Sequence, residues 1–209
     1  MGDDVRRAPL TARRDDLAAL EASSGGRVRA TEVAGLTQVS LRMDPAVATL
    51  LPFELPLTPN TAVADHPRDV LWLGPDEWLV IEAATDATAA PSGTGWFAAG
   101  SGTAAHAGAR PPIVDELEAA LAGVVHGVVD LSAGRAVVDL SGGGRHEVLS
   151  SACPLDFHPR SWGAGRCAQT VLGRTQVLLQ ERQEMTRVFV RPSFGSYLVD
   201  LLSDAAAAA

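Results

Sequence analysis

The sequence predicts an α+β fold with mostly antiparallel sheets, because strand pairs joined by tight turns alternate with single helical segments. The clearest pair is Asp69–Glu82, where two apolar runs flank the turn at residues 74–77. A second pair, within Arg166–Gln180, surrounds a turn at residues 172–174. Both strands of the first pair are apolar on both faces, so we expect this hairpin to be covered on both sides.

Helical periodicity separates these strand pairs. Pro residues precede Ile113, acidic residues occupy the first turn and Gly123 follows the end, so Ile113–Ala122 is predicted to be a helix. Ser141 is a candidate N-cap for a second helix over Gly142–Cys153. The remaining predicted helices are Asp15–Ala22 and a C-terminal helix that Pro192–Ser193 opens.

Five further runs have the character of strands. The sequence Val-Val-Asp-Leu-Ser occurs at 128–132 and again at 137–141, with a short Gly-containing segment between the copies. This arrangement predicts another hairpin. Single strands are predicted at Val28–Val33, Leu36–Met43 and Arg187–Arg191.

The predicted elements divide the chain into two α+β halves, at 15–82 and 111–204. Residues 83–110 consist mostly of Ala, Gly, Ser, Thr and Pro, which bury too little apolar surface to offset the entropy of ordering. We expect this segment to be a disordered insertion. Residues 1–14 are expected to form a flexible arm, and the alanine tail at 205–209 is expected to fray.

Composition excludes several kinds of chemistry. The 209 residues carry a formal charge of −8, and all 17 basic residues are Arg. Without lysine the chain can form no Schiff base with pyridoxal phosphate and has no P-loop lysine. The acidic balance argues against a nucleic-acid partner. The charged N-terminal residues and the absence of a long apolar run predict a cytoplasmic protein with no membrane partner.

No pattern of nucleophiles or metal ligands stands out. The two cysteines, Cys153 and Cys167, are expected to be reduced and buried. Cys153 and His158 could form a nucleophile pair, but prolines fix the backbone between them, which favours a structural loop. His146–Glu147 begins like a zinc-protease motif, but Ser150 stands where the second histidine ligand belongs.

Carboxylates and a glycine motif give equally weak signals. Residues 100–105 match G-x-G-x-x-A, but no strand-turn-helix context surrounds them, so the match is interpreted as coincidence. In the simplest hairpin register Asp130 and Asp139 fall on opposite faces, so each is expected to pair with an Arg such as Arg135 or Arg166, or with turn amides. We therefore assign no catalytic, cofactor-binding or metal-binding residue.

Two tryptophans, Trp78 and Trp162, lie near predicted turns. Large aromatic side chains anchor many interfaces, yet they are equally typical of a core. Both roles stay open at this stage.

Several short strings occur in a fixed order along the chain: Leu-Thr-Pro-Asn at 57–60, Leu-Trp-Leu-Gly-Pro-Asp-Glu-Trp-Leu at 71–79, Val-Asp-Leu-Ser at 129–132 with Gly-Arg at 134–135, Cys-Pro-Leu-Asp at 153–156 with His-Pro at 158–159, Gly-Arg-Cys-Ala-Gln-Thr at 165–170, and Arg191 with Ser193–Phe194 and Tyr197–Leu198. Together these strings resemble the gamma subunit of heterotetrameric sarcosine oxidase, from about residue 50 to 202 apart from the insertion at 83–110.

The resemblance implies a fold related to the folate-binding aminomethyltransferase-like (T-protein/TrmE N-terminal) domain, with two βαβ-type halves. It also implies alpha, beta and delta subunits as partners in a complex that oxidatively demethylates sarcosine to glycine. In that family the one-carbon unit goes to tetrahydrofolate and hydrogen peroxide is released. FAD, FMN, NAD and tetrahydrofolate are assigned chiefly to the alpha and beta subunits and zinc to delta, so the gamma subunit is implied to be non-catalytic.

Two alternative functions remain. The implied fold also suits an independent folate-binding one-carbon transferase, for which Asp130 or Asp139 would have to supply a carboxylate in a folate cavity. A small cysteine-dependent hydrolase would instead need Cys153 or Cys167 as a thiolate beside an imidazole or Arg.

Overall fold

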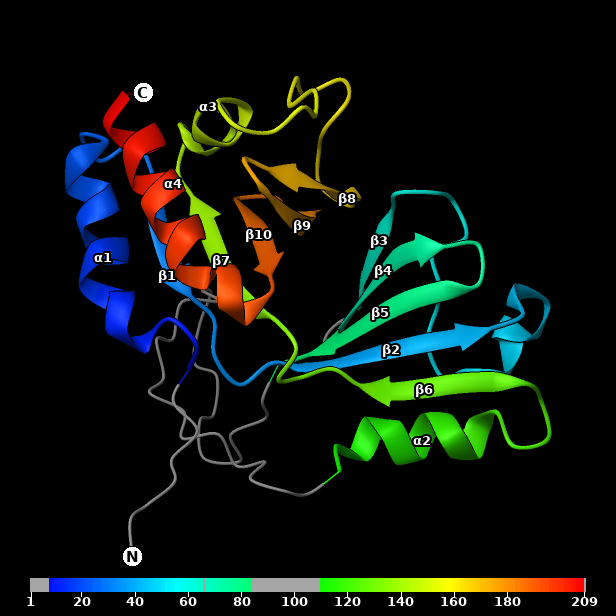
Figure 1. Cartoon of the computed structure of the whole chain (residues 1–209). Coiled ribbons are helices and arrows are strands. Elements are labelled where there is room, and N and C mark those ends of the chain that lie inside the picture. The colour runs from blue at the N-terminus through cyan, green and yellow to red at the C-terminus, as the bar shows by residue number, and fades with distance from the viewer. Residues whose placement is uncertain (1–7, 66, 84–109, 209) are drawn as a thin grey trace, which may run out of the picture.

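The computed structural model describes residues 8–65, 67–83 and 110–208 (Figure 1). The expectations for residues 1–7, for residues 84–109 and for the glycine motif at 100–105 therefore lie outside the described residues. Within the described residues the strands form two five-stranded antiparallel sheets.

Sheet 1 has the strand order β1-β7-β10-β9-β8, and sheet 2 has the order β3-β4-β5-β2-β6. The strands are β1 (Arg29–Glu32), β2 (Thr37–Met43), β3 (Ala62–Asp65), β4 (Arg68–Gly74), β5 (Glu77–Glu82), β6 (His126–Asp130), β7 (Ala136–Ser141), β8 (Cys167–Leu172), β9 (Thr175–Glu181) and β10 (Met185–Val190). The α-helices are α1 (Arg14–Ser23), α2 (Pro112–Ala120), α3 (Arg145–Ser150) and α4 (Gly195–Ala208).

The sheets and helices stack in four layers. Helices α1, α3 and α4 cover one face of sheet 1, and α2 covers one face of sheet 2 (Figure 1). The two remaining faces pack against each other through a third apolar cluster, to which Leu79 and Ile81 contribute from sheet 2, and Leu178 and Phe189 from sheet 1. The β4–β5 hairpin is therefore buried on both faces, as its apolar sequence predicts.

The predicted hairpin at 128–132 and 137–141 is wrong. Strand β6 pairs with β2 in sheet 2, whereas β7 pairs with β1 and β10 in sheet 1. The chain crosses between the sheets once before β2 and once after β6, and the crossings lie side by side: Val33 N donates to Val137 O at 2.8 Å, and Leu131 N donates to Gln38 O at 2.7 Å. Each sequence half thus supplies one strand to the other half's sheet, so neither sheet is built from one half alone.

Two segments predicted to be loose are ordered where the structure describes them. Leu10, within the expected arm, is 1% exposed and belongs to the core of sheet 1. Helix α4 continues through Ala208, and Ala206 is as deeply buried as Leu10. The Leu10 side chain packs against the start of α4 at Gly195. A Cβ at Gly195 would lie 2.5 Å from this side chain, so glycine permits the contact. Residues 8–14 and 205–208 thus contribute to the fold.

Helix α3 is shorter than the predicted Gly142–Cys153. It begins at Arg145, because Gly142 has a φ of +96° and Ser141 still belongs to β7. A Cβ on Gly142 would lie 2.3 Å from Arg27 O, so the backbone needs glycine there. Ser141 therefore ends a strand and does not cap the helix.

Candidate functional site

The two cysteines are buried in different apolar clusters. The Cys167 thiol is fully buried, and its single proton faces two acceptors, Thr61 O at 3.2 Å and Trp72 O at 3.4 Å. Burial raises the pKa of the Cys167 thiol to about 11, which disfavours the thiolate. Cys153 Sγ lies 3.8 Å from Thr170 Oγ1. These environments give no support to a cysteine-dependent hydrolase.

The two strand aspartates are each held by protein donors. Asp130 accepts from the Ser132 backbone N–H at 2.9 Å and from the Ser132 hydroxyl, as expected for a turn carboxylate. Asp139 receives both Nε and Nη2 of Arg187, at 2.7 and 2.9 Å. The expectation of an arginine partner for Asp139 is confirmed, but that partner is Arg187 and not Arg135 or Arg166.

Both candidate anchor tryptophans are core residues. Trp78 is fully buried, and its Nε1–H donates to Pro56 O at 2.8 Å. Trp162 is buried with its Nε1–H bonded to Glu181 Oε2, and its ring lies edge-on to Phe157. The possibility that either ring anchors a partner is therefore overturned, because neither ring is available at the surface.

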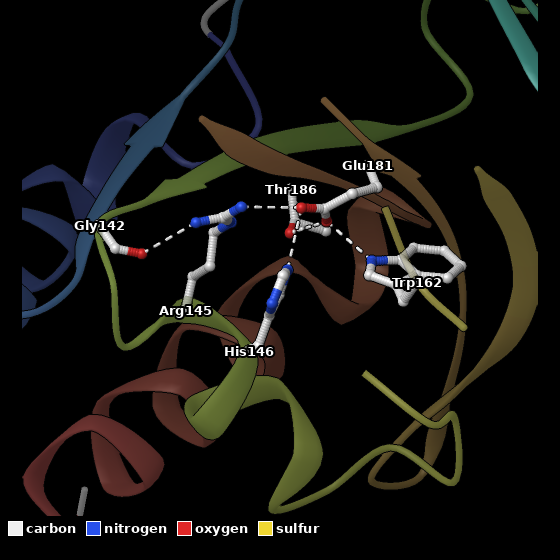
Figure 2. Close-up of polar contacts among 6 residues, drawn as sticks. All are labelled: Gly142, Arg145, His146, Trp162, Glu181 and Thr186. Carbon is white, nitrogen blue, oxygen red and sulfur yellow. Dashed lines mark hydrogen bonds and ion pairs between the residues drawn. The ribbon is translucent and has the colours of Figure 1, made fainter. Parts of the chain in front are cut away.

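The most elaborate polar cluster surrounds Glu181, at the end of β9 (Figure 2). Its Oε1 lies 2.9 Å from both Arg145 Nη2 and His146 Nε2, which come from α3. Its Oε2 accepts from Trp162 Nε1 at 2.8 Å and from the Thr186 hydroxyl. Because Glu181 is only 2% exposed and these side chains take up both oxygens, the carboxylate joins α3, β10 and the segment between α3 and β8.

A second polar cluster joins the two sheets. Asp69 on β4 accepts from Gln180 Nε2 at 3.1 Å and forms an ion pair with Arg182. Arg187 Nη1 lies 3.9 Å from the same carboxylate and also holds Asp139. Burial lowers the pKa of Arg187, but the hydrogen bonds and charge of Asp139 outweigh it, so the pKa is raised overall. This cluster ties sheet 2 to three strands of sheet 1.

Neither cluster was predicted from the sequence. Glu181 and Asp69 each appear in the sequence as one acidic residue at the end of an apolar strand. Apart from Thr186, five residues after Glu181, their partners are far away along the chain. Within residues 8–65, 67–83 and 110–208, no three His, Cys, Asp or Glu side chains gather as a metal site would require. No helix in these same ranges is long and apolar enough to cross a bilayer.

Comparison with known proteins gives the family. The model of the sarcosine oxidase gamma subunit family matches residues 104–208. The chain is 34% identical to sarcosine oxidase subunit gamma of Arthrobacter sp, over 96% of this chain and 91% of that protein. The chain belongs to the sarcosine oxidase gamma subunit family. Identity to the same subunit of Corynebacterium sp. (strain P-1) is 33% over 96% of this chain, so the resemblance inferred from the short strings is confirmed.

Solved structures agree with the family and the fold. A chain of the heterotetrameric sarcosine oxidase from Corynebacterium sp. U-96, in complex with pyrrole 2-carboxylate, matches with a TM-score of 0.77 and 29% identity over 98% of this chain and 96% of that chain. Aminomethyltransferase T of the glycine cleavage system from Bartonella henselae matches with a TM-score of 0.56 and 11% identity, over 89% of this chain and 48% of that chain. The predicted aminomethyltransferase-like α+β fold is thus confirmed.

Proposed function

We propose that this chain assembles with alpha, beta and delta subunits into a heterotetrameric sarcosine oxidase and serves there as a non-catalytic subunit. The observation that carries the proposal is similarity over nearly the whole length to gamma subunits, including a chain of a solved heterotetramer. In the proposed complex sarcosine is oxidatively demethylated to glycine, the one-carbon unit passes to tetrahydrofolate, and hydrogen peroxide is released.

The non-catalytic role is supported by how the polar groups of this chain are used. Glu181, Asp69 and Asp139 are occupied by side chains of the same chain, and Cys167 is held as a neutral thiol. We assign FAD, FMN, NAD, tetrahydrofolate and zinc to the other subunits of the complex. The folate-transferase alternative rests on fold similarity at 11% identity, which carries no activity with it.

The test is co-expression of this chain, with a tag, alongside the alpha, beta and delta subunits of the same organism. We expect one complex that contains all four chains and releases peroxide when sarcosine is added. The isolated chain should bind neither flavin nor tetrahydrofolate, as measured by absorbance and by calorimetric titration. Full assembly and turnover of the other three subunits, without co-elution of this chain, would refute the proposal; tetrahydrofolate binding by the isolated chain would favour the transferase.

A further inference from the structure

Three arginines that form no ion pair among the described residues lie close together on one part of the surface. A groove of about 530 Å³ lies over β8, β9 and β10, with Leu178 and Phe189 in its lining and Arg135 and Arg191 among its polar groups. A smaller hollow of about 200 Å³ contains Arg174 and shares Arg191 with the groove. We call this combined surface the arginine groove; its defining residues are Arg135, Arg174, Arg191, Gln176, Leu178 and Phe189.

Arg135 is the most unusual of these residues. Its Nη1 atom is buried and has no hydrogen-bond partner, and within the described residues it forms no ion pair. Burial lowers the pKa of the Arg135 guanidinium. The charge of Glu77, which is not hydrogen-bonded to Arg135, opposes this effect only in part. A charge removed from water without a counter-ion is costly, so a carboxylate that reached Arg135 would gain more than one at an ordinary surface arginine.

The other two arginines of the groove add to its positive charge. Across the described part of the chain, neither Arg174 nor Arg191 forms an ion pair, whereas most other arginines there do. The whole chain has a formal charge of −8, so three neighbouring arginines that form no ion pair among the described residues stand out from the average surface. Its charge is complementary to an acidic ligand.

Apolar side chains flank this charge. Val171 in the groove is 43% exposed, and Phe194 in the adjoining hollow is 38% exposed. Exposed apolar groups beside unpaired charges are typical of a protein interface, with charged groups fixing the register of the partner. The two connected hollows suit an extended segment better than a compact small molecule.

We propose that the arginine groove docks an extended acidic segment of another subunit of the sarcosine oxidase complex, with one carboxylate of that segment beside Arg135 and its apolar side chains on Val171 and Phe194. This proposal rests on the proposed function, because it requires that the chain enters such a complex. It goes further by giving the docking surface and the chemistry of the partner segment.

The first test is competition during assembly. Tagged variant and untagged wild-type chains are co-expressed with the other subunits, and mass spectrometry measures the ratio of the two in the purified complex. For the double variant Arg174→Glu/Arg191→Glu, the ratio of variant to wild-type chain in the complex should fall at least about tenfold. This corresponds to a loss of about 1.4 kcal/mol in the free energy of association. The matched control, Arg14→Glu/Arg160→Glu, changes the same charge at exposed arginines outside the groove and should compete like the tagged wild type.

The outcomes separate the two proposals. Equal incorporation of the groove variant and the control would overturn the docking site while leaving the function intact. Failure of the tagged wild-type chain to enter any complex would instead refute the proposed function. Circular dichroism of the isolated variants, unchanged from wild type, would show that a lost competition reflects docking and not unfolding.

A second experiment identifies the occupant. A photoreactive phenylalanine analogue placed at the exposed position 176 is irradiated in the assembled complex, and the cross-linked peptide is sequenced. We expect a peptide of the alpha, beta or delta subunit with Asp or Glu close to the cross-link. Cross-links within this chain alone, or succinate binding by the isolated chain with no cross-link to a partner, would overturn the proposal in favour of an empty surface or a small-molecule site.

Discussion

Glu181 and Arg135 lie in or beside the same sheet and present opposite electrostatic situations. The Glu181 carboxylate is buried among Arg145, His146, Trp162 and Thr186, so both of its oxygens have donors. The Arg135 guanidinium is partly buried with Nη1 unpartnered, and no described residue forms an ion pair with it.

The contrast distinguishes buried charges that are paired within the chain, such as Glu181, from those that have no ion pair within it, such as Arg135. Polar groups buried in native proteins nearly always have hydrogen-bond partners, because an unmet group loses its hydration without compensation. Both oxygens of the Glu181 carboxylate meet this condition within one chain, and among the donors around it Arg145 Nε is buried without a partner. Arg145 still has its ion pair with Glu181, whereas Arg135 has none among the described residues, and in the proposed complex a carboxylate of another subunit supplies it.

The largest effect should come from Glu181→Ala. Removal of this carboxylate leaves two cationic or protonatable groups and two neutral donors without their acceptor, so we expect the free energy of unfolding to fall by about 3–5 kcal/mol. Urea denaturation of the isolated chain measures this loss. Glu184→Ala, at an exposed position three residues later, is the matched control and should change stability by less than about 0.5 kcal/mol. A loss below about 1 kcal/mol for Glu181→Ala would show that the cluster does not hold the fold.

The next effect concerns Cys167, a core group whose partners suit only its neutral form. Its pKa is raised to about 11 in the folded chain, above the value of about 8.5 for an unfolded thiol. The stability contributed by the protonated thiol is therefore complete below the unfolded pKa and is lost as pH rises through the folded pKa. Between pH 8 and 11 we expect wild type to lose about 2–3 kcal/mol more than Cys167→Ala, measured by urea denaturation at each pH. Cys153→Ala keeps Cys167 and should follow wild type; parallel curves for wild type and Cys167→Ala would contradict the prediction.

Local signals in the sequence were enough for much of the fold. The β4–β5 and β8–β9 hairpins were predicted because strand, turn and strand are adjacent, and Pro75 or Gly173 marks the turn. The exchange of β1 and β6 between the sheets was missed, because the segment between β6 and β7 has the composition of a hairpin turn. Only the distant strands β2 and β10 reveal that its two ends diverge.

The polar clusters were harder to predict from the sequence than the hairpins. Glu181 meets Trp162 and His146 across 19 and 35 residues, and nothing local marks it as more than the end of an apolar strand. Trp162 could be core or interface by composition, and only its bond to Glu181 decides between them. Arg135 was expected to be a possible partner of Asp130 or Asp139. Instead, Arg187 donates to Asp139, and the Ser132 backbone N–H donates to Asp130.

Arg135→Met should have a small effect on the isolated chain, opposite in sign to that of Glu181→Ala. Methionine keeps much of the apolar stem and removes a charge without a carboxylate partner, so the free energy of unfolding should stay the same or rise by up to about 1 kcal/mol. Arg187→Met is the matched control: it breaks the bidentate pair with Asp139 and should cost several kcal/mol, about 3–5. Urea denaturation of both variants makes the comparison. A comparable loss for Arg135→Met would mean that Arg135 is already satisfied within the chain.

The smallest effect should come from His126, a partnered charge near the surface. The Val124 carbonyl, 2.8 Å from Nδ1, and Glu118, 3.1 Å from Nε2, raise the pKa of His126 above its usual value near 6.5. The stability of the protonated form is thus fully present below about pH 6.5 and is lost as pH rises through the folded pKa. Because solvent screens such pairs, His126→Gln should lower the free energy of unfolding by about 0.5 kcal/mol or less at pH 5.5 in low salt, and by nothing measurable at pH 9. A larger loss at pH 9 than at pH 5.5 would show that the imidazole stabilises the fold through packing and not through its charge. His126 could then not be compared with Glu181 as a surface charge against a buried one.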